Sequence, residues 1–151
     1  MANTYTQIYL HIVFAVKYRQ NYLRVKDEEL HKYLAGIAKS LNCRLLAANN
    51  MEDHIHLLIS KSPTISEAEL VQKLKANSSR WLKAHLNNNK FQWQKGFGAF
   101  SYSPSAIENV KRYIANQQEH HRRKSFREEY LNFLKAFEIK YNTDYLFEFY
   151  D

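Results

Sequence analysis

The stretch that decides the fold is EDHIHLLIS, residues 52–60, in which polar and aliphatic side chains alternate before an apolar end. Successive side chains of a β-strand project to opposite faces, so residues two apart share a face. The aliphatic side chains at alternate positions form one apolar row: Ile55, Leu57 and Ile59. That row is suited to packing under helices, and His54 and His56 then lie together on the opposite, open face.

The paired imidazoles have two interpretations. Two neutral imidazoles side by side supply half of a divalent metal site. A pair of structural histidines explains the spacing equally well in a chain that has 7 histidines. The alternation favours metal ligands, because aliphatic residues fill every core position while both imidazoles share the open face.

The sequence around this strand predicts a regular order of strands and helices. Alternation predicts strands over residues 5–18, 43–48, 54–60 and 97–102. Apolar residues at helical spacing predict helices over 26–41, after Ser66, over 106–121 and after Ser125. Asp27 is the expected cap of the first helix, and Ser-x-x-Glu capping boxes begin the other three at Ser66, Ser105 and Ser125. The pair Asn49–Asn50 is expected to form a hairpin turn.

This order predicts an α+β fold. The first six elements match the split β-α-β arrangement of ferredoxin-like and RNA-recognition-like domains. An antiparallel sheet then packs two helices on one face and leaves the other for function or for a further helix. We expect one domain over residues 1–151, with residues 125–151 forming a C-terminal helix and an aromatic, acidic tail.

Composition limits the partners and the compartment. The net charge of +7 favours a polyanion, of which nucleic acid is the commonest. The single Cys43 excludes an intrachain disulfide and a multi-cysteine zinc site, and fits a cytoplasmic protein. No window approaches the roughly 20 apolar residues of a membrane span, so no membrane partner is expected.

The segment YIANQ, residues 113–117, offers a partner for the histidine pair. Residues four apart share a helical face, so Tyr113 and Gln117 point the same way. Such a helix, lying over the open face of the sheet, would bring a phenol and an amide oxygen to the imidazoles. A surface Tyr and Gln on an amphipathic helix accounts for the spacing as well.

EDHIHLLIS and SYSPSAIENVKRYIANQQEHH, residues 101–121, together resemble the HUH-type single-tyrosine transposases of small prokaryotic insertion sequences, including palindrome-associated relatives. The His-hydrophobe-His motif corresponds to His54-Ile55-His56. The helical tyrosine nucleophile of that family, with a glutamine ligand four residues later, corresponds to Tyr113 and Gln117. The resemblance covers the chain through about residue 121.

The resemblance implies an activity and a set of partners. A divalent Mg²⁺ or Mn²⁺ ion held by His54, His56 and Gln117 would assist attack of Tyr113 on single-stranded DNA hairpins at element ends, through a covalent 5′-phosphotyrosine. It also implies a homodimer in which Tyr113 of one subunit can serve the site of the other. The alternatives are a domesticated single-strand nuclease and a non-catalytic nucleic-acid-binding relative.

The remaining candidates are basic or titratable residues near these motifs. Two basic groups are candidate phosphate contacts: Lys73, Arg80 and Lys83, and Arg122 and Arg123. Asp53 could orient a ligand histidine, but a turn residue is the preferred interpretation. His11 is expected to make structural hydrogen bonds. His120 and His121 are interpreted as helix-end residues that could approach a phosphate or metal.

Overall fold

The structure is a computed structural model that describes residues 3–141. Four strands form one sheet: β1 Tyr9–Ala15, β2 Arg44–Asn50, β3 His54–Ser60 and β4 Gly98–Tyr102. Five helices accompany it: α1 Glu28–Ser40, α2 Glu67–His85, α3 Ile107–Ala115, α4 Gln117–His120 and α5 Phe126–Ala136. Short 3-10 turns lie at Lys17–Arg19 and Pro104–Ala106. Residues 142–151 of the expected tail lie outside the described residues.

The sheet is antiparallel throughout and has the strand order β2-β3-β1-β4. The central pair, β1 and β3, sets Val13 opposite His56 and Ala15 opposite His54. This order, with α1 and α2 as the crossovers, is the split β-α-β topology, so the predicted α+β fold is confirmed.

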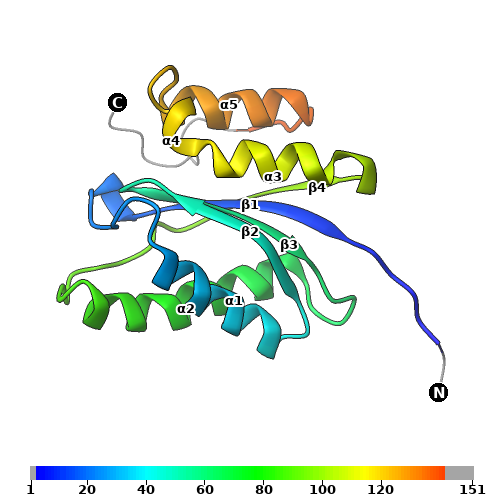
Figure 1. The fold of residues 1–151 in the computed structure, drawn as a ribbon, viewed down its shortest axis with the longest axis horizontal. Coiled ribbons are helices and arrows are strands. Elements are labelled where there is room, and N and C mark those ends of the chain that lie inside the picture. The colour runs from blue at the N-terminus through cyan, green and yellow to red at the C-terminus, as the bar shows by residue number, and fades with distance from the viewer. Residues whose placement is uncertain (1–2, 142–151) are drawn as a thin grey trace.

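Helices cover both faces of the sheet (Figure 1). Helices α1 and α2 lie on one face, and α3, α4 and α5 lie on the other. The apolar row of β3 packs into the main core with the α1 and α2 side chains. Leu58, whose side chain points the other way, packs against Val110 and Ile114 of α3. The alternation in β3 therefore assigns its aliphatic row and its imidazoles to different faces, as predicted.

Side-chain caps begin three of the helices as expected. Asp27 accepts a hydrogen bond from the Leu30 N–H at the start of α1. Ser66 and Ser125 accept from the N–H groups three residues later, at the starts of α2 and α5. These caps satisfy amide groups that have no partner within the helix.

Three details differ from the prediction. The strand expected over 5–18 is limited to Tyr9–Ala15, and a 3-10 turn at Lys17–Arg19 follows it. Asn49 and Asn50 are the last residues of β2 and are buried, so they do not form the expected turn. The helix expected over 106–121 begins later and is broken, because a 3-10 turn with Pro104 precedes Ile107 and Ser105 is not its cap. The break at Asn116 has a visible cause: the Asn49 side-chain amide donates to the carbonyls of Ile114 and Ala115 at the end of α3.

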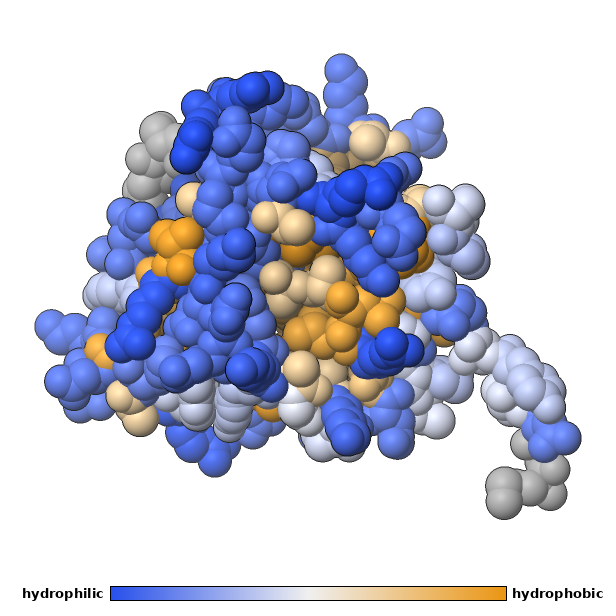
Figure 2. Space-filling model, in the orientation of Figure 1, coloured by the Kyte–Doolittle hydropathy of each residue, from blue (hydrophilic) through white to orange (hydrophobic). Residues whose placement is uncertain are grey.

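The surface is mostly hydrophilic in the view of Figure 2. A hydrophobic area near its centre lies over β2, the edge strand, where residues 45–48 are partly buried. Among the described residues, no helix is long and apolar enough to cross a membrane.

Candidate active site

His54 is held in one orientation by a chain of charged contacts. Its Nδ1–H donates to Asp53 Oδ1 at 2.7 Å. The guanidinium of Arg19 donates in turn to Asp53 Oδ2 from Nε at 2.9 Å and from Nη2 at 2.6 Å. A proton on Nδ1 leaves the Nε2 lone pair available, which is the arrangement that metal-bound histidines adopt.

The pKa values of this pair agree with that arrangement. Burial opposes ionisation of Asp53, but contact with His54 and Arg19 outweighs it and lowers the Asp53 pKa to about 2. Burial lowers the pKa of His54 to about 4, although Asp53 opposes the shift. At neutral pH, Asp53 is therefore a carboxylate and His54 a neutral imidazole that can donate a lone pair to a cation.

His56 is fully buried between two partners. Its Nδ1 lies 2.8 Å from His11 Nε2, and its Nε2 lies 3.0 Å from Glu129 Oε1. His11 is itself fully buried, and burial together with His56 lowers its pKa well below the ordinary value. The structural hydrogen bonding expected of His11 is confirmed, and this residue fixes the ring orientation of His56.

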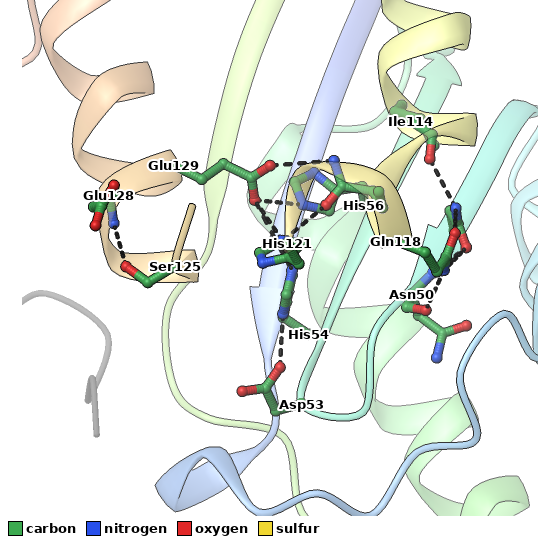
Figure 3. A network of polar contacts seen from close by, with 12 residues as sticks. Asn50, Asp53, His54, His56, Ile114, Gln118, His121, Ser125, Glu128 and Glu129 are labelled. Atoms are coloured by element: carbon green, nitrogen blue, oxygen red, sulfur yellow. Dashed lines mark hydrogen bonds and ion pairs between the residues drawn. The ribbon is translucent and has the colours of Figure 1, made fainter. Parts of the chain in front are cut away.

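Two further residues complete the cluster around the imidazoles (Figure 3). His121 Nε2 lies 3.0 Å from His54 Nε2, at the end of α4. Glu129 reaches the same point from the first turn of α5, with Oε1 at 3.4 Å from His121 Nε2. One ligand atom from each of His54, His56, His121 and Glu129 lies within 4.8 Å of the others.

This donor set fits a divalent cation. Donor atoms bound at about 2.1 Å around a tetrahedral ion are separated by roughly 3.4 Å. Glu129 Oε1 lies 3.0 to 3.9 Å from the Nε2 atoms of His54, His56 and His121, and the Nε2 atoms of His54 and His121 are 3.0 Å apart. The three rings offer imidazole nitrogens and the buried Glu129 carboxylate offers an oxygen, a donor set that suits a first-row divalent ion.

Tyr113 and Gln117 meet this cluster from α3 and α4. The Tyr113 hydroxyl donates to Glu129 Oε2. Gln117 is fully buried; its Nε2 donates to the same oxygen at 3.2 Å, and its Oε1 lies 3.1 Å from His121 Nε2. Burial raises the pKa of Tyr113 above its ordinary value, and the charge of Glu129 raises it further, so the phenol is protonated here. All these groups belong to the one chain that the structure describes.

The two basic groups predicted from the sequence lie in different places. Lys73, Arg80 and Lys83 are on α2, across the sheet from Tyr113. Arg122 and Arg123 follow α4 on the side of the cluster. Arg122 Nη1 lies 3.3 Å from Glu119 Oε2, and Arg123 Nη2 lies 3.9 Å from Glu119 Oε1. Arg123 also lines a cavity of about 420 Å³ that includes Tyr113 and Glu129 in its wall.

Glu129 is the residue that sequence reasoning missed. It lies 73 positions from His56 in the chain. The capping box at Ser125 assigned a role only to its neighbour Glu128. Asp53 was interpreted as a turn residue, yet it is buried and bonded to His54. His121 follows Gln117 by four positions on the helix, and that spacing is the signal that could have assigned it to the cluster.

The sequence is similar to those of known proteins. Residues 4–117 match the family described as "Transposase IS200 like". The chain is 29% identical over 126 residues to the transposase for insertion sequence element IS200 of Salmonella typhimurium, covering 79% of this chain and 82% of the relative. It is 28% identical over 122 residues to ISDra2 transposase TnpA of Deinococcus radiodurans, covering 75% and 86%.

The fold is also similar to that of a solved structure. A REP-associated tyrosine transposase bound to a REP hairpin matches with a TM-score of 0.57 over 80% of this chain and 73% of that chain. The sequence identity is 11%, so this likeness concerns the fold alone. The family match ends at residue 117, before His121 and Glu129.

Proposed function

Because the chain belongs to the family of IS200-like transposases, we propose that it cuts and rejoins single-stranded DNA at hairpin-bearing element ends, through a covalent 5′-phosphotyrosine on Tyr113. The observation that carries this proposal is the position of the Tyr113 hydroxyl, which shares the carboxylate of Glu129 with His56. A nucleophile must lie beside the groups that stabilise charge on the phosphate.

The residues present fit a catalytic cation. We propose His54, His56 and Gln117 as ligands of a divalent ion, Mg²⁺ or Mn²⁺, in a site that Asp53 and His11 orient from behind. When bound, the ion would neutralise charge on the phosphate under attack. The neutral state of His54 at pH 7 keeps its lone pair free for that purpose.

Tyr113 carries the covalent step. Its oxygen forms a bond to phosphorus as the bond from phosphorus to the 3′-oxygen breaks in line, and the phenolic proton is lost while the departing strand gains one as a 3′-hydroxyl. Attack by the 3′-hydroxyl of a second strand reverses the sequence and releases Tyr113. One phosphoester bond replaces another in each step, so no nucleotide cofactor is required.

The DNA path follows the positive charge. We propose that Arg122 and Arg123, next to the cavity at Tyr113, contact the backbone of the strand that is cut. Lys73, Arg80 and Lys83 lie on the far side of the sheet, so they would contact DNA remote from the cut. The net charge of +7 supports sequence-independent attraction for the whole path.

We also propose that the working form is a homodimer. Within residues 3–141, Tyr113 is the tyrosine whose hydroxyl reaches Glu129, and joining two element ends requires two covalent attachments at once. Since Tyr113 lies in the same chain as His54, each subunit of such a dimer can begin with a complete site. Light scattering of the protein with and without hairpin DNA tests the stoichiometry, and a 1:1 complex during joining would contradict the dimer.

The direct test is adduct formation. Hairpin-bearing single-stranded oligonucleotides from the DNA flanking the gene, labelled at the 3′ end, are incubated with the protein and Mn²⁺ and separated on a denaturing gel. Label that migrates with the protein reports the phosphotyrosine. We expect Tyr113→Phe to abolish this band while retaining DNA binding, because the variant removes only the hydroxyl that donates to Glu129.

The matched control is Tyr33→Phe. Tyr33 lies on α1, across the sheet, and its ring stacks on Trp81. Tyr33→Phe also removes one phenolic hydroxyl, but far from the cluster, so the adduct is expected to persist in this variant. An adduct that survives Tyr113→Phe would assign the nucleophile to another residue, and wild-type protein that binds the hairpin without forming any adduct would contradict the transesterase.

A further inference from the structure

The carboxylate of Glu129 lies where a ligand of a cation at the imidazoles would lie. It comes from α5, which follows residues 4–117, the part of the chain that matches the family. Glu129 has an exposed fraction of only 5%. Helix α5 begins one turn earlier, where Ser125 accepts from the Glu128 N–H and fixes the first turn (Figure 3). Phe126 anchors the same turn by stacking on the His54 ring, with centroids 4.1 Å apart. The first turn of α5 is therefore tied to the strand that carries the imidazoles.

The two oxygens of Glu129 have different partners. Oε1 faces the imidazoles, at 3.0 Å from His56 Nε2, 3.4 Å from His121 Nε2 and 3.9 Å from His54 Nε2. Oε2 faces the other way and accepts from Tyr113 and Gln117. One carboxylate thus lies between the donor atoms of the site and the hydroxyl of the proposed nucleophile.

A buried carboxylate of this kind requires compensating charge. Isolation of an ionised carboxylate from water is costly unless it is paired or coordinates a metal. The side chains around Oε1 are the three histidines of the cluster, whose Nε2 atoms lie 3.0 to 3.9 Å from it. A divalent cation at the point where the four donor atoms converge would pair with the charge of this carboxylate.

We propose that Glu129 and His121 complete the cation site of His54 and His56, and that Glu129 at the same time positions Tyr113 beside the bound ion. This inference rests on the proposed function for the role of the cation, but not for its binding. Three imidazoles and one carboxylate make a donor set for a divalent ion of the Mn²⁺ to Zn²⁺ series. Gln117, proposed above as a ligand, adjoins these four donors, with Nε2 bonded to Oε2 and Oε1 lying 3.1 Å from His121 Nε2.

The inference gives helix α5 a role in the site. The segment that follows residue 117 would not be an accessory to the matched domain, since it would deliver two further ligands, His121 and Glu129. Removal of the carboxylate is expected to weaken cation binding and to release the Tyr113 hydroxyl, while the imidazole pair on β3 stays in place.

Cation affinity of the metal-free full-length chain measures this directly. Mn²⁺ is titrated into the EDTA-treated protein and followed by calorimetry and by the free-ion EPR signal. We expect one Mn²⁺ per wild-type chain and an affinity at least about tenfold lower in Glu129→Gln, which keeps the size but not the charge of the side chain. The matched control, Glu128→Gln, alters the exposed neighbour in the same turn and is expected to bind as the wild type does.

The outcomes separate this inference from the proposed function. If folded Glu129→Gln binds Mn²⁺ as tightly as the wild type while His54→Ala binds it weakly, Glu129 is not a ligand, and the inference is overturned with the imidazole site intact. If Mn²⁺ binding depends on Glu129 but no DNA adduct forms, the inference stands and the proposed function fails. Should circular dichroism show that Glu129→Gln is unfolded, His121→Gln decides, and unchanged affinity there overturns the donor set.

Discussion

The two faces of the sheet are built for different purposes. The face under α1 and α2 buries a continuous aliphatic core, which includes Ile55 and Leu57 of β3. The face under α3, α4 and α5 buries two imidazoles at alternate positions of the same strand, together with the Glu129 carboxylate of α5. Alternate residues of β3 therefore have different roles: one row packs into the apolar core, and the other carries the polar groups of the candidate site.

The polar face carries a cost that the apolar face offsets. Nδ1 of His11 is buried without a hydrogen-bond partner among the residues that the structure describes. An unsatisfied buried polar atom costs about 1 to 3 kcal/mol, whereas full burial of one large aliphatic side chain contributes roughly the same amount in the opposite sense. Substitutions on the two faces should therefore separate stability from cation binding.

The largest expected effect on stability is that of Leu57→Ala. Leu57 is fully buried on the apolar face, and its truncation leaves a cavity among the α1 and α2 side chains. We expect a loss of about 3 kcal/mol in the free energy of unfolding, measured by urea denaturation. The Mn²⁺ affinity of the molecules that remain folded should not change, and a parallel loss of affinity would show that the two faces are coupled.

Asp53→Asn should give the reverse result. The variant removes the charge that holds His54 Nδ1–H and pairs with Arg19, so we expect Mn²⁺ affinity to fall by about 10- to 100-fold. Asp27→Asn is the matched control. Asp27 Oδ2 lies 2.8 Å from His85 Nε2, and this pair is on the opposite face of the sheet from His54. Calorimetry of both variants measures the difference, and equal affinities would remove Asp53 from any orienting role.

A pH effect is expected from Lys75 on α2. Burial lowers its pKa from 10.5 to about 8. Between pH 8 and 10.5 the unfolded chain then binds more protons at this residue, so its contribution to stability rises with pH and is lost below that window. We expect the stability of the wild type relative to Lys75→Met to increase by about 1 kcal/mol from pH 8 to 10.5, after allowance for solvent screening.

Urea denaturation at several pH values measures that difference. Lys75 donates to the Gln94 and Gly96 carbonyls, so we expect Lys75→Met to be less stable at every pH. The test is how the difference in unfolding free energy between the two proteins changes with pH. A constant gap across the window would show that the lysine titrates alike in both states. Mn²⁺ affinity at fixed pH should be the same in both proteins, since Lys75 belongs to the apolar face.

The smallest effects are expected from two matched helix caps. Ser66→Ala and Ser125→Ala each remove a side-chain acceptor at 3.1 Å from a helix N–H, which costs about 1 kcal/mol. Ser125 begins the helix that carries Glu129, so Ser125→Ala alone should weaken Mn²⁺ binding, and by less than Glu129→Gln does. Thermal unfolding and Mn²⁺ titration of both variants check this, and weaker binding in Ser66→Ala would oppose the assignment.

The local part of the site could be predicted from the sequence. His54 and His56 share a face because side chains in a strand alternate, and the observed strand His54–Ser60 matches the expected range. Tyr113 and Gln117 meet the same cluster because they are four positions apart, although the helix is broken between them at Asn116. Both relations depend on backbone periodicity, which is a local property.

Other contacts could not be predicted, because they join segments that are distant in the chain. Asn49 was expected in a turn, yet it extends β2 and donates to the end of α3, 65 positions away. Glu129 looked like any acidic residue in the first turn of a helix, where negative charge is common. Its burial against His56 depends on how α5 lies over the sheet, and no spacing in the sequence encodes that placement.

Which residues share a face, which helices are capped and how the strands and helices follow one another could all be read from the amino-acid order, since each depends on neighbours within a few positions. The tertiary structure alone decided that Asp53, His121 and Glu129 join the imidazole pair, and that Tyr113 meets the histidines of its own chain. The physical reason is that convergence of buried polar groups is set by the packing of α3, α4 and α5 on the sheet, where each group must find a partner once water is excluded.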